Sequence, residues 1–272
     1  MAKPRRRYNR SVSDHPAILV FDSGLGGLTV LREIVKARPD AACAYVADDA
    51  FFPYGHHTED EIIGRVVPLI GELIAQHAPR LVVIACNTAS TLVMTHLRAS
   101  YTVSFVGTVP ASKPAGASSK TKRVSVLGTK GTVKREYTQR LIADFGQGCD
   151  VSLVGAADLP SLAEAALRGE PVGDDAIAAE IAPCFHDGDM RTDTVVLACT
   201  HFPLLLDRLI ALAPWPVNWI DPAPAIARRS AELLGPAASA TAAPQPTFQF
   251  TSGRPALAHD ILAPFFGMHV SA

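Results

Sequence analysis

Short apolar segments alternate with longer segments of helical periodicity along most of this 272-residue chain. Two of the short segments, LVVIA (residues 81–85) and TVVLA (residues 194–198), lack the apolar and polar alternation of a half-exposed strand. Strands buried on both faces have such sequences, and they occur in parallel sheets that helices cover on both sides. The alternation therefore predicts an α/β fold with mostly parallel sheets.

The residue types and their spacing also predict individual elements. Strands are expected at residues 17–21, 43–47, 81–85, 103–106, 123–127, 151–154, 194–198 and 217–220. Helices are expected at residues 29–37, 59–77, 133–145 and 203–212, the last because Pro203 fits a first helical turn. Two segments rich in small residues and proline, 110–122 and 235–246, are predicted to be linkers.

Composition narrows the class of protein. A hydrophobic fraction of 48% is enough for a real core, in one large domain or two small ones. The formal net charge of -1 gives no electrostatic reason to expect nucleic acid or an anionic membrane as a partner. No apolar run approaches the roughly 18 residues that a membrane span needs. Residues 1–16 are basic and are predicted to be a disordered tail, the alternative being an arm for nucleic acid or a partner.

The chain contains an odd number of cysteines, and none of them forms a CxxC pair. This pattern favours reduced thiols and a cytoplasmic location over a disulfide framework or a zinc knuckle. Cys43, Cys149 and Cys184 have no polar setting at a strand end, so we interpret them as packed side chains. Cys86 and Cys199 directly follow LVVIA and TVVLA, the two segments without alternation.

The two halves of the chain repeat one pattern. In the first half, one strand leads into DSGLGG (residues 22–27) and a later strand leads into CNT (residues 86–88). In the second half, one strand leads into GTKGT (residues 128–132) and a later strand leads into CTH (residues 199–201). A duplicated α/β unit explains the repeat most simply, with chance similarity between strand ends as the alternative.

Two opposed thiols suit one kind of chemistry. Open parallel sheets bind ligands outside the carboxyl ends of their strands, so two facing units would place Cys86 and Cys199 across one cleft. A stereocentre inverts when a base removes its α-proton and an acid delivers a proton to the opposite face. A thiolate and a thiol can exchange these roles, because the pKa of cysteine is readily tuned. Helix N-termini would favour the thiolates, and we expect Thr88 and Thr200 to cap those helices.

Other polar residues near these strand ends have predicted roles. We expect His201 to relay protons or to polarise Cys199. Asp22 is expected to orient a base or hold an ammonium group, with helix capping as the alternative. The pair His56–His57 is interpreted as surface. The glycine-rich turn does not complete a nucleotide-binding GxGxxG pattern, and no His/Cys spacing indicates a metal site.

Five segments, FDSGLGGLTVL, DDAFFPYG, IACNTAS, VLGTKGTV and LACTHFPLL, resemble the signature blocks of glutamate racemases in the aspartate/glutamate racemase superfamily. The resemblance implies two similar α/β domains with mostly parallel sheets, related by a pseudo-twofold axis, with the active site in the cleft between them. It implies a first domain of residues 17–109 plus 222–272 and a second domain of residues 110–221, after the tail of residues 1–16.

The resemblance also implies an activity: interconversion of L- and D-glutamate without cofactor or metal, which supplies D-glutamate for peptidoglycan in the cell wall. Cys86 would act on D-glutamate and Cys199 on L-glutamate. The family's substrate-binding positions fall on Asp22, Ser23, Tyr54, Gly55, Asn87, Thr88, Thr129, Thr132, Thr200 and His201. Asp48 and Glu164 would be supporting acidic residues near the site.

Several alternatives stay open at this point. Within the superfamily, the chain could act on another acidic amino acid such as aspartate, or be a hydantoin racemase or a related decarboxylase. A thiol-redox or metal-binding protein would need Cys86 and Cys199 within disulfide distance, or tetrahedral ligands that include His201. A pyridoxal enzyme would need Lys130 as its Schiff-base lysine. A binding protein could act through the basic tail. The oligomeric state is open, a homodimer being one arrangement.

Overall fold

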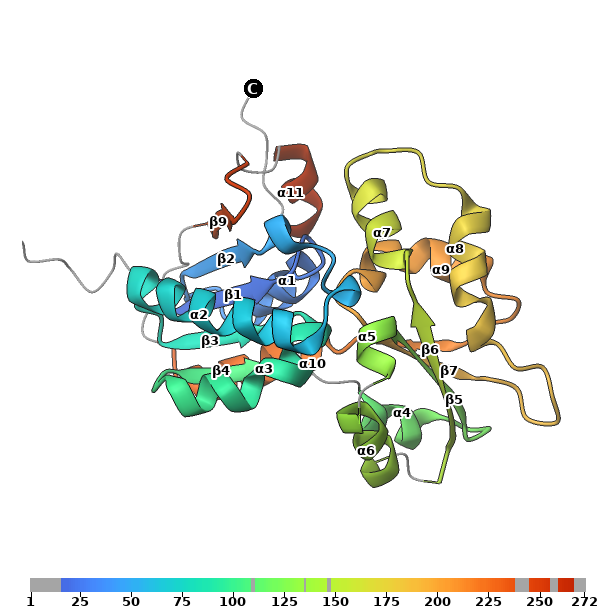
Figure 1. The fold of residues 1–272 in the computed structure, drawn as a ribbon. Coiled ribbons are helices and arrows are strands. Elements are labelled where there is room, and N and C mark those ends of the chain that lie inside the picture. The colour runs from blue at the N-terminus through green and yellow to red at the C-terminus, as the bar shows by residue number, and fades with distance from the viewer. Residues whose placement is uncertain are drawn as a thin grey trace, which may run out of the picture.

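The computed structural model describes residues 16–108, 111–134, 136–145, 148–237, 245–254 and 259–266. Its strands form two sheets that lie side by side, one in each half of the molecule (Figure 1). Apart from residue 16, the predicted basic tail lies outside the described residues.

The first sheet has the strand order β4-β3-β1-β2-β9, and every neighbouring pair is parallel. Its strands are β1 (Ile18–Asp22), β2 (Cys43–Ala47), β3 (Leu81–Ile84), β4 (Ser104–Gly107) and β9 (Thr247–Phe250). β9 comes from near the end of the chain, so the chain returns to the first sheet after completing the second (Figure 1). The domain boundaries that the family resemblance implies stay a prediction.

The second sheet has the order β6-β5-β7-β8 and is also parallel throughout. Its strands are β5 (Arg123–Thr129), β6 (Asp150–Ala156), β7 (Thr194–Ala198) and β8 (Asn218–Ile220). The order β4-β3-β1-β2 of the first sheet corresponds strand for strand to β8-β7-β5-β6 of the second. The prediction of two similar α/β units with mostly parallel sheets is confirmed.

Helices connect the strands and cover the sheets. The α-helices are α1 (Leu28–Ala37), α2 (Glu59–His77), α3 (Asn87–Ser100), α4 (Ser112–Ser118), α5 (Lys130–Val133), α6 (Glu136–Phe145), α7 (Leu159–Leu167), α8 (Asp174–Ile181), α9 (Leu206–Leu212), α10 (Ala223–Leu234) and α11 (His259–Phe266). The 3₁₀ helices are η1 (Asp49–Phe51), η2 (Tyr54–His56), η3 (Ala182–Cys184) and η4 (Phe202–Leu205).

Both faces of the first sheet are buried. Along β1, Ile18 and Val20 belong to a core shared with α1, α10 and α11, whereas Leu19 and Phe21 belong to a core shared with α2 and α3. All five residues of β1 are buried. Burial on both faces removes any need for a polar face, which explains the unbroken apolar sequences of these strands.

The second sheet repeats this arrangement. On β7, Val195 and Leu197 pack with α7, α8 and α9, and Val196 packs on the opposite face. That face also holds Ala115 of α4, which is 1% exposed. The prediction that residues 110–122 form a linker is therefore wrong for α4. The small residues of this segment let α4 lie close against the sheet. The same small residues, judged by composition alone, predicted a loop.

Other predicted elements differ from the structure mainly at their ends. The helix expected at 59–77 is confirmed as α2, and Thr58 caps it in a capping box with Glu61. The helix expected at 203–212 is divided into η4, in whose first turn Pro203 lies, and α9. The segment expected at 133–145 is divided into α5 and α6. Most of the second predicted linker, residues 238–244, lies outside the described residues.

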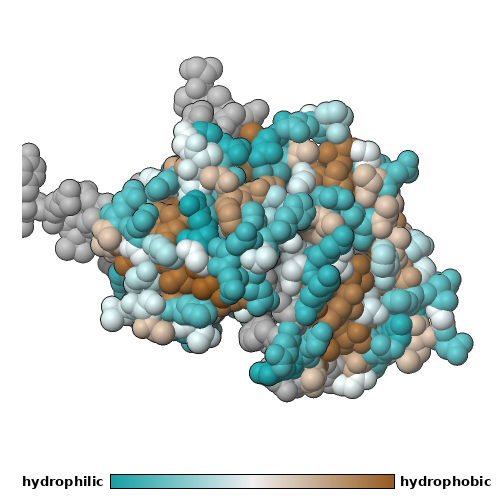
Figure 2. All heavy atoms as spheres, in the orientation of Figure 1, coloured by the Kyte–Doolittle hydropathy of each residue, from teal (hydrophilic) through white to brown (hydrophobic). Residues whose placement is uncertain are grey.

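The face drawn in Figure 2 carries hydrophilic and hydrophobic residues in mixture, with hydrophobic residues gathered over β6, the edge strand of the second sheet. Within the described ranges, no helix is both long enough and apolar enough to cross a membrane.

Candidate active site

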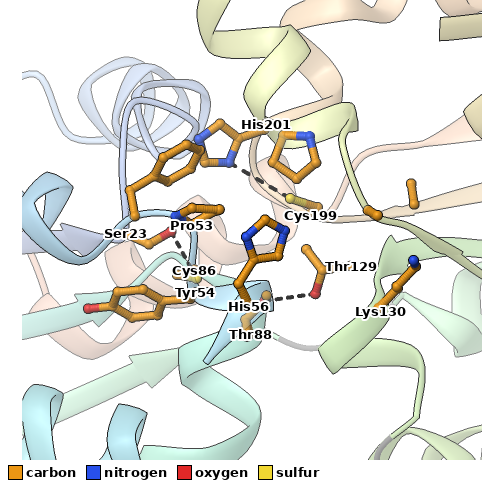
Figure 3. A pocket seen from close by; sticks show the side chains of 15 residues that line it. Ser23, Pro53, Tyr54, His56, Cys86, Thr88, Thr129, Lys130, Cys199 and His201 are labelled. Carbon is orange, nitrogen blue, oxygen red and sulfur yellow. Dashed lines mark hydrogen bonds between the residues drawn. The ribbon is translucent and has the colours of Figure 1, made fainter. Parts of the chain in front are cut away.

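A pocket lies where the carboxyl ends of strands from both sheets meet (Figure 3). It contains about 440 Å³ of empty space, part of which is open to solvent. The lining residues are Ser23, Phe52, Pro53, Tyr54, Gly55, His56, Cys86 and Thr88 from the first unit, and Thr129, Lys130, Ala156, Ala157, Pro160, Cys199 and His201 from the second. The position agrees with the rule for open parallel sheets.

Cys86 lies on the first unit's side of the pocket, at the N-terminus of α3. Its Sγ is 3.5 Å from the Oγ of Ser23, which follows β1 (Figure 3). Burial, reinforced by the nearby charge of Asp22, raises the pKa of the Cys86 thiol to about 12, against the effect of Ser23 and of the Ala89 backbone amide. Without a ligand, Cys86 is therefore a neutral thiol at physiological pH.

Cys199 lies on the opposite side of the pocket and has a different partner (Figure 3). Its Sγ is 3.8 Å from Nδ1 of His201, and Nε2 of His201 is 3.0 Å from Oε1 of Glu164 on α7. Nε2 is also 3.3 Å from the backbone nitrogen of Gly26, but it cannot accept from that N–H while donating to Glu164. The shorter contact with a carboxylate assigns the proton to Nε2, which leaves Nδ1 to share a proton with Cys199.

The surroundings of His201 favour its charged form. Burial disfavours an imidazolium, but the hydrogen bonds and charges of Cys199 and Glu164 outweigh burial and raise the pKa of His201 to about 10. For Glu164, burial is likewise outweighed by His201, so its pKa lies below the ordinary value. The three side chains form a buried carboxylate–imidazole–thiol series that spans α7 and the turn after β7.

Asp22 lies behind the pocket wall and connects the two units. Its Oδ1 accepts a hydrogen bond from Oγ1 of Thr200 at 3.0 Å, and its Oδ2 accepts one from the Gly24 backbone at 3.1 Å. Burial raises the pKa of Asp22, although His201 and these hydrogen bonds oppose the shift. The expected capping role of Thr200 is wrong, because its hydroxyl donates to the other unit.

Three threonine hydroxyls form a second connection across the pocket. Oγ1 of Thr88 is 3.0 Å from Oγ1 of Thr129 and 3.2 Å from Oγ1 of Thr132, and the latter two are 3.0 Å apart. Thr129 also caps α5 by accepting from the Thr132 backbone N–H. The expected capping role of Thr88 is wrong too, since α3 has no side-chain cap and this hydroxyl faces the second unit.

The glycine-rich turn after β1 allows the two units to approach closely. A Cβ on Gly24 would lie 2.1 Å from Oε1 of Glu164, and a Cβ on Gly26 would lie 2.6 Å from the backbone nitrogen of His201. The Leu25 backbone N–H also donates to Oε1 of Glu164 at 2.8 Å. Backbone contact with the second unit, rather than with a phosphate, accounts for glycine at these positions.

Asp48 supports the wall that contains Tyr54 and Gly55. Its Oδ2 accepts a hydrogen bond from the Tyr54 hydroxyl at 2.7 Å, and Arg65 donates to both of its oxygens. Although burial opposes it, the hydrogen bonds from Arg65, Thr251 and Tyr54 lower the pKa of Asp48. Asp48 is therefore an ionised group that does not itself line the pocket.

Asn87, directly after Cys86, is 2% exposed, and neither its Oδ1 nor its Nδ2 has a hydrogen-bond partner. An unsatisfied buried amide costs about 1–3 kcal/mol, so such a group is expected to have a function or a further partner.

The predicted site residues form two layers. Those that line the pocket are Ser23, Tyr54, Gly55, Cys86, Thr88, Thr129, Cys199 and His201. Those that lie behind the lining are Asp22, Asp48, Asn87, Thr132, Glu164 and Thr200. Their roles toward a substrate stay predictions.

Several lining residues had no predicted pocket role: Phe52, Pro53, His56, Ala156, Ala157 and Pro160. Lys130 was considered only as the Schiff-base lysine of a pyridoxal enzyme, and it also lines the pocket. The carboxyl end of β6 could have indicated Ala156 and Ala157, since it lies at the same sheet edge as the predicted residues. All five cysteines are free. Within the described part of the chain, no group of three or more His, Cys, Asp or Glu side chains is arranged to hold a metal ion.

Comparisons with known proteins agree with this arrangement. The sequence profile of the Asp/Glu/Hydantoin racemase family matches residues 18–229. A glutamate racemase of Brucella canis is 55% identical over 226 residues, 82% of this chain and 82% of that protein. One of Sinorhizobium medicae is 52% identical over 258 residues, 94% of this chain and 95% of that protein. The crystal structure of Escherichia coli glutamate racemase with L-glutamate and the activator UDP-MurNAc-Ala has a TM-score of 0.82 and 41% identity, covering 92% and 93% of the two chains.

Proposed function

The chain belongs to the Asp/Glu/Hydantoin racemase family and is an isomerase of its glutamate racemase group, and from this premise we propose that Cys86 and Cys199 interconvert L- and D-glutamate by proton transfer at Cα. One observation carries the mechanism. The two thiols follow corresponding strands, β3 and β7, of a duplicated unit and line opposite sides of one pocket (Figure 3).

The proposed step needs one thiolate and one thiol. The thiolate takes the α-proton, so the Cα–H bond breaks, an S–H bond forms, and the electron pair stays on Cα and delocalises into the adjacent carboxylate. The thiol on the other face then gives its proton to Cα. The product is the opposite enantiomer, and the two sulfurs have exchanged protonation states, so proton transfer as proposed consumes no other reactant.

The neighbours of the thiols indicate which one starts as the base. His201, held protonated by Glu164, places a positive charge beside Cys199, with Nδ1 3.8 Å from Sγ, while the raised pKa of Cys86 keeps that group protonated. In this resting state, Cys199 would take the α-proton of L-glutamate and Cys86 would supply the proton that forms D-glutamate. Reversing the direction requires the opposite starting state, which the completed reaction itself produces.

Polar groups around the thiols suit a dicarboxylic amino acid. We propose that Asn87 donates through Nδ2 to a substrate carboxylate and accepts at Oδ1 from the substrate ammonium group, and that the hydroxyls of Thr88 and Thr129 also donate to a carboxylate. Lys130 lines the same pocket and would add positive charge for an anionic ligand, and His56, which also lines it, would add a hydrogen-bonding imidazole. These assignments support glutamate, and comparing turnover of glutamate and aspartate tests them directly.

Removing either thiol tests the mechanism. Cys86→Ala and Cys199→Ala should each lose essentially all racemisation, measured in both directions by circular dichroism or chiral chromatography. In deuterium oxide, the wild-type product should carry deuterium at Cα. Near wild-type turnover in either variant, or retention of the original hydrogen in the product, would contradict the two-base mechanism.

We also propose that the D-glutamate supplies peptidoglycan synthesis. Expression of the chain should then restore growth to a bacterial strain that depends on added D-glutamate, and a Cys86→Ala chain should not. Growth with neither chain would contradict the role in the cell wall. A cytoplasmic location and a homodimer stay predictions.

A further inference from the structure

Residues from the end of the chain hold the loop that forms one wall of the pocket. The turn after β9 (residues 251–254, the C-terminal turn) contacts residues 48–57 (the wall loop), about two hundred positions earlier in the sequence. Oγ1 of Thr251 donates to Oδ1 of Asp48 at 2.7 Å and accepts from the Ala50 backbone N–H at 3.2 Å. The Thr251 backbone N–H donates to the Ala47 carbonyl oxygen at 3.1 Å.

The neighbouring acid of the wall loop is held from the same turn. Oδ1 of Asp49 accepts from the Ser252 backbone N–H at 3.0 Å, and its Oδ2 accepts from Oγ of Ser252 at 2.6 Å. Nε of Arg254 lies 2.5 Å from Oδ2 of Asp49, whose side chain is only 4% exposed. Two consecutive carboxylates of the wall loop, Asp48 and Asp49, thus each accept hydrogen bonds from the same turn.

Asp48 transmits this contact to the pocket. Its other oxygen, Oδ2, accepts the hydrogen bond from Tyr54, which is 2% exposed and lines the pocket beside Cys86 (Figure 3). Without Thr251, Oδ1 of Asp48 would keep only Arg65, whose side chain is 38% exposed. Arg65 donates to both oxygens of Asp48, but water can compete for an arginine this exposed, so without Thr251 the carboxylate would hold the Tyr54 hydroxyl less firmly.

We propose that Thr251 is a positioning residue for the substrate pocket, acting through Asp48 on Tyr54 and so on the wall that the glutamate must contact. The inference rests on the proposed function. Thr251 lies outside residues 18–229, the part of the chain that the racemase family profile matches, so the family match does not assign it. The thiols of Cys86 and Cys199 contact Ser23 and His201, and neither thiol hydrogen-bonds to the C-terminal turn.

The expected kinetic effect follows from this placement. The wall contacts the substrate before and during proton transfer. Loosening the wall therefore weakens binding of the ground state and of the transition state equally. Such a loss raises KM and leaves kcat nearly unchanged. One buried hydrogen bond corresponds to about a threefold to tenfold change in affinity.

The test compares three variants of β9 and its turn. Thr251→Val keeps the shape of the side chain and removes the hydroxyl, so KM for glutamate should rise about threefold to tenfold, with kcat within about twofold of wild type. Thr251→Ser restores the hydroxyl and should restore KM. Thr247→Val, the same exchange at an exposed position of β9, is the matched control and should have wild-type KM. A Thr251→Val enzyme with wild-type KM would overturn the proposal.

Coupling to Tyr54 separates positioning from general destabilisation. If Thr251 acts through Asp48 on the Tyr54 hydroxyl, Tyr54→Phe combined with Thr251→Val should raise KM hardly more than the larger single effect. Fully multiplicative effects would overturn the route through Tyr54. If Thr251→Val does not fold, Thr251→Ala removes the same hydroxyl with a smaller side chain, and it should raise KM by a similar factor. An unchanged KM in that variant would then overturn the proposal.

A separate readout distinguishes this inference from the proposed function. If the wild-type protein does not racemise glutamate, the proposed function fails, but the contact can still be measured by hydrogen exchange in residues 49–57. Thr251→Val should increase exchange there about threefold to tenfold, and Thr251→Ser and Thr247→Val should not. Equal exchange in wild type and Thr251→Val would overturn the inference independently of any activity.

Discussion

Cys86 and Cys199 occupy equivalent places in the two units but have different neighbours. Cys86 begins α3 and has a hydroxyl neighbour, Ser23, which the first unit itself supplies. Cys199 precedes η4 and lies beside His201, which Glu164 holds from α7. The two units share the strand ends that present the sulfurs, but the side chains beside the two sulfurs differ.

The difference shows which part of the site must be symmetric. In the proposed mechanism, inversion at Cα requires a group on each face that can accept or donate a proton, and each unit presents one thiol for this role. The neighbours of the two thiols need not be the same, because the mechanism requires only that each sulfur can be a thiol at one stage of turnover and a thiolate at another. A buried imidazolium, that of His201, lies beside Cys199, whereas burial and Asp22 favour the thiol at Cys86.

One thermodynamic limit shapes every test of this asymmetry. L- and D-glutamate have equal free energies in achiral water, so kcat/KM must be the same in both directions for any variant. An unequal role for the two thiols can therefore appear in kcat, in isotope effects or in proton exchange, but never in the ratio of the two kcat/KM values.

The largest effect is expected from replacing one sulfur by oxygen. Cys199→Ser and Cys86→Ser should each lower kcat for racemisation about a hundredfold to ten-thousandfold, because a serine hydroxyl is a poor acid and base near neutral pH. Slow exchange of the α-hydrogen with deuterium oxide should persist for D-glutamate in the first variant and for L-glutamate in the second, as NMR can measure. The reverse pattern would exchange the roles assigned to the two thiols.

Removing the imidazole should affect one thiol more than the other. His201→Asn should lower kcat about a hundredfold, and Glu164→Gln by a smaller factor, since the carboxylate acts only through the imidazole. The primary isotope effect with α-deuterated glutamate should increase more for the L enantiomer, whose proton Cys199 takes. Equal increases for both enantiomers would show that His201 serves both thiols.

Ser23→Ala tests the weaker partner. Loss of one hydrogen bond at Cys86 should lower kcat about tenfold or less, because Ser23 only moderates the raised pKa of that thiol. The alkaline pH at which turnover of L-glutamate declines, where Cys86 loses the proton it must donate, should move upward, as a pH–rate profile would reveal. A loss as large as that of His201→Asn would mean that the two thiols have partners of equal importance.

The smallest expected effect concerns stability against pH. The folded-state pKa of His201, about 10, lies above its ordinary value of 6.5. Its contribution to stability is therefore complete below pH 6.5 and is lost as pH rises toward 10. The raised pKa of Cys86 changes the stability of the fold only above pH 9.0, the ordinary pKa of that thiol. Between pH 6.5 and 9, Tm should fall by a few degrees in wild type and change less in His201→Asn, measured by calorimetry in one buffer series. Parallel curves would contradict a charged His201.

Several residues that line the pocket could be predicted from the sequence, because their positions depend on short segments of the chain. Runs such as LVVIA and TVVLA identify buried strands, and in a parallel sheet the residues that follow them must lie at one edge. The repeat of these runs then predicted a second, equivalent edge. Ser23, Thr129 and both cysteines follow from this reasoning together with the family resemblance.

The partners of those residues could not be predicted in the same way. Sequence reasoning assigned Thr88 and Thr200 to helix caps, a local role, because a hydroxyl near a helix start usually bonds to its own backbone. In the structure both hydroxyls bond across to the other unit, Thr88 to Thr129 and Thr200 to Asp22. Because the two units pack closely together, each of these hydroxyls finds its hydrogen-bond partner in the other unit and not in its own helix.

The sequence alone determined the two α/β units, their parallel strands and the two thiols at corresponding strand ends, because these depend on short-range hydrophobic pattern and strand direction. The position of His201 beside Cys199 was expected from the sequence, but only the tertiary structure decided that Glu164 holds His201, that Ser23 lies beside Cys86, and that Thr251 supports Asp48. Those contacts join segments far apart in the chain, and they form only when the units and the returning C-terminal strand pack together. No local pattern records which distant side chain will arrive beside each thiol.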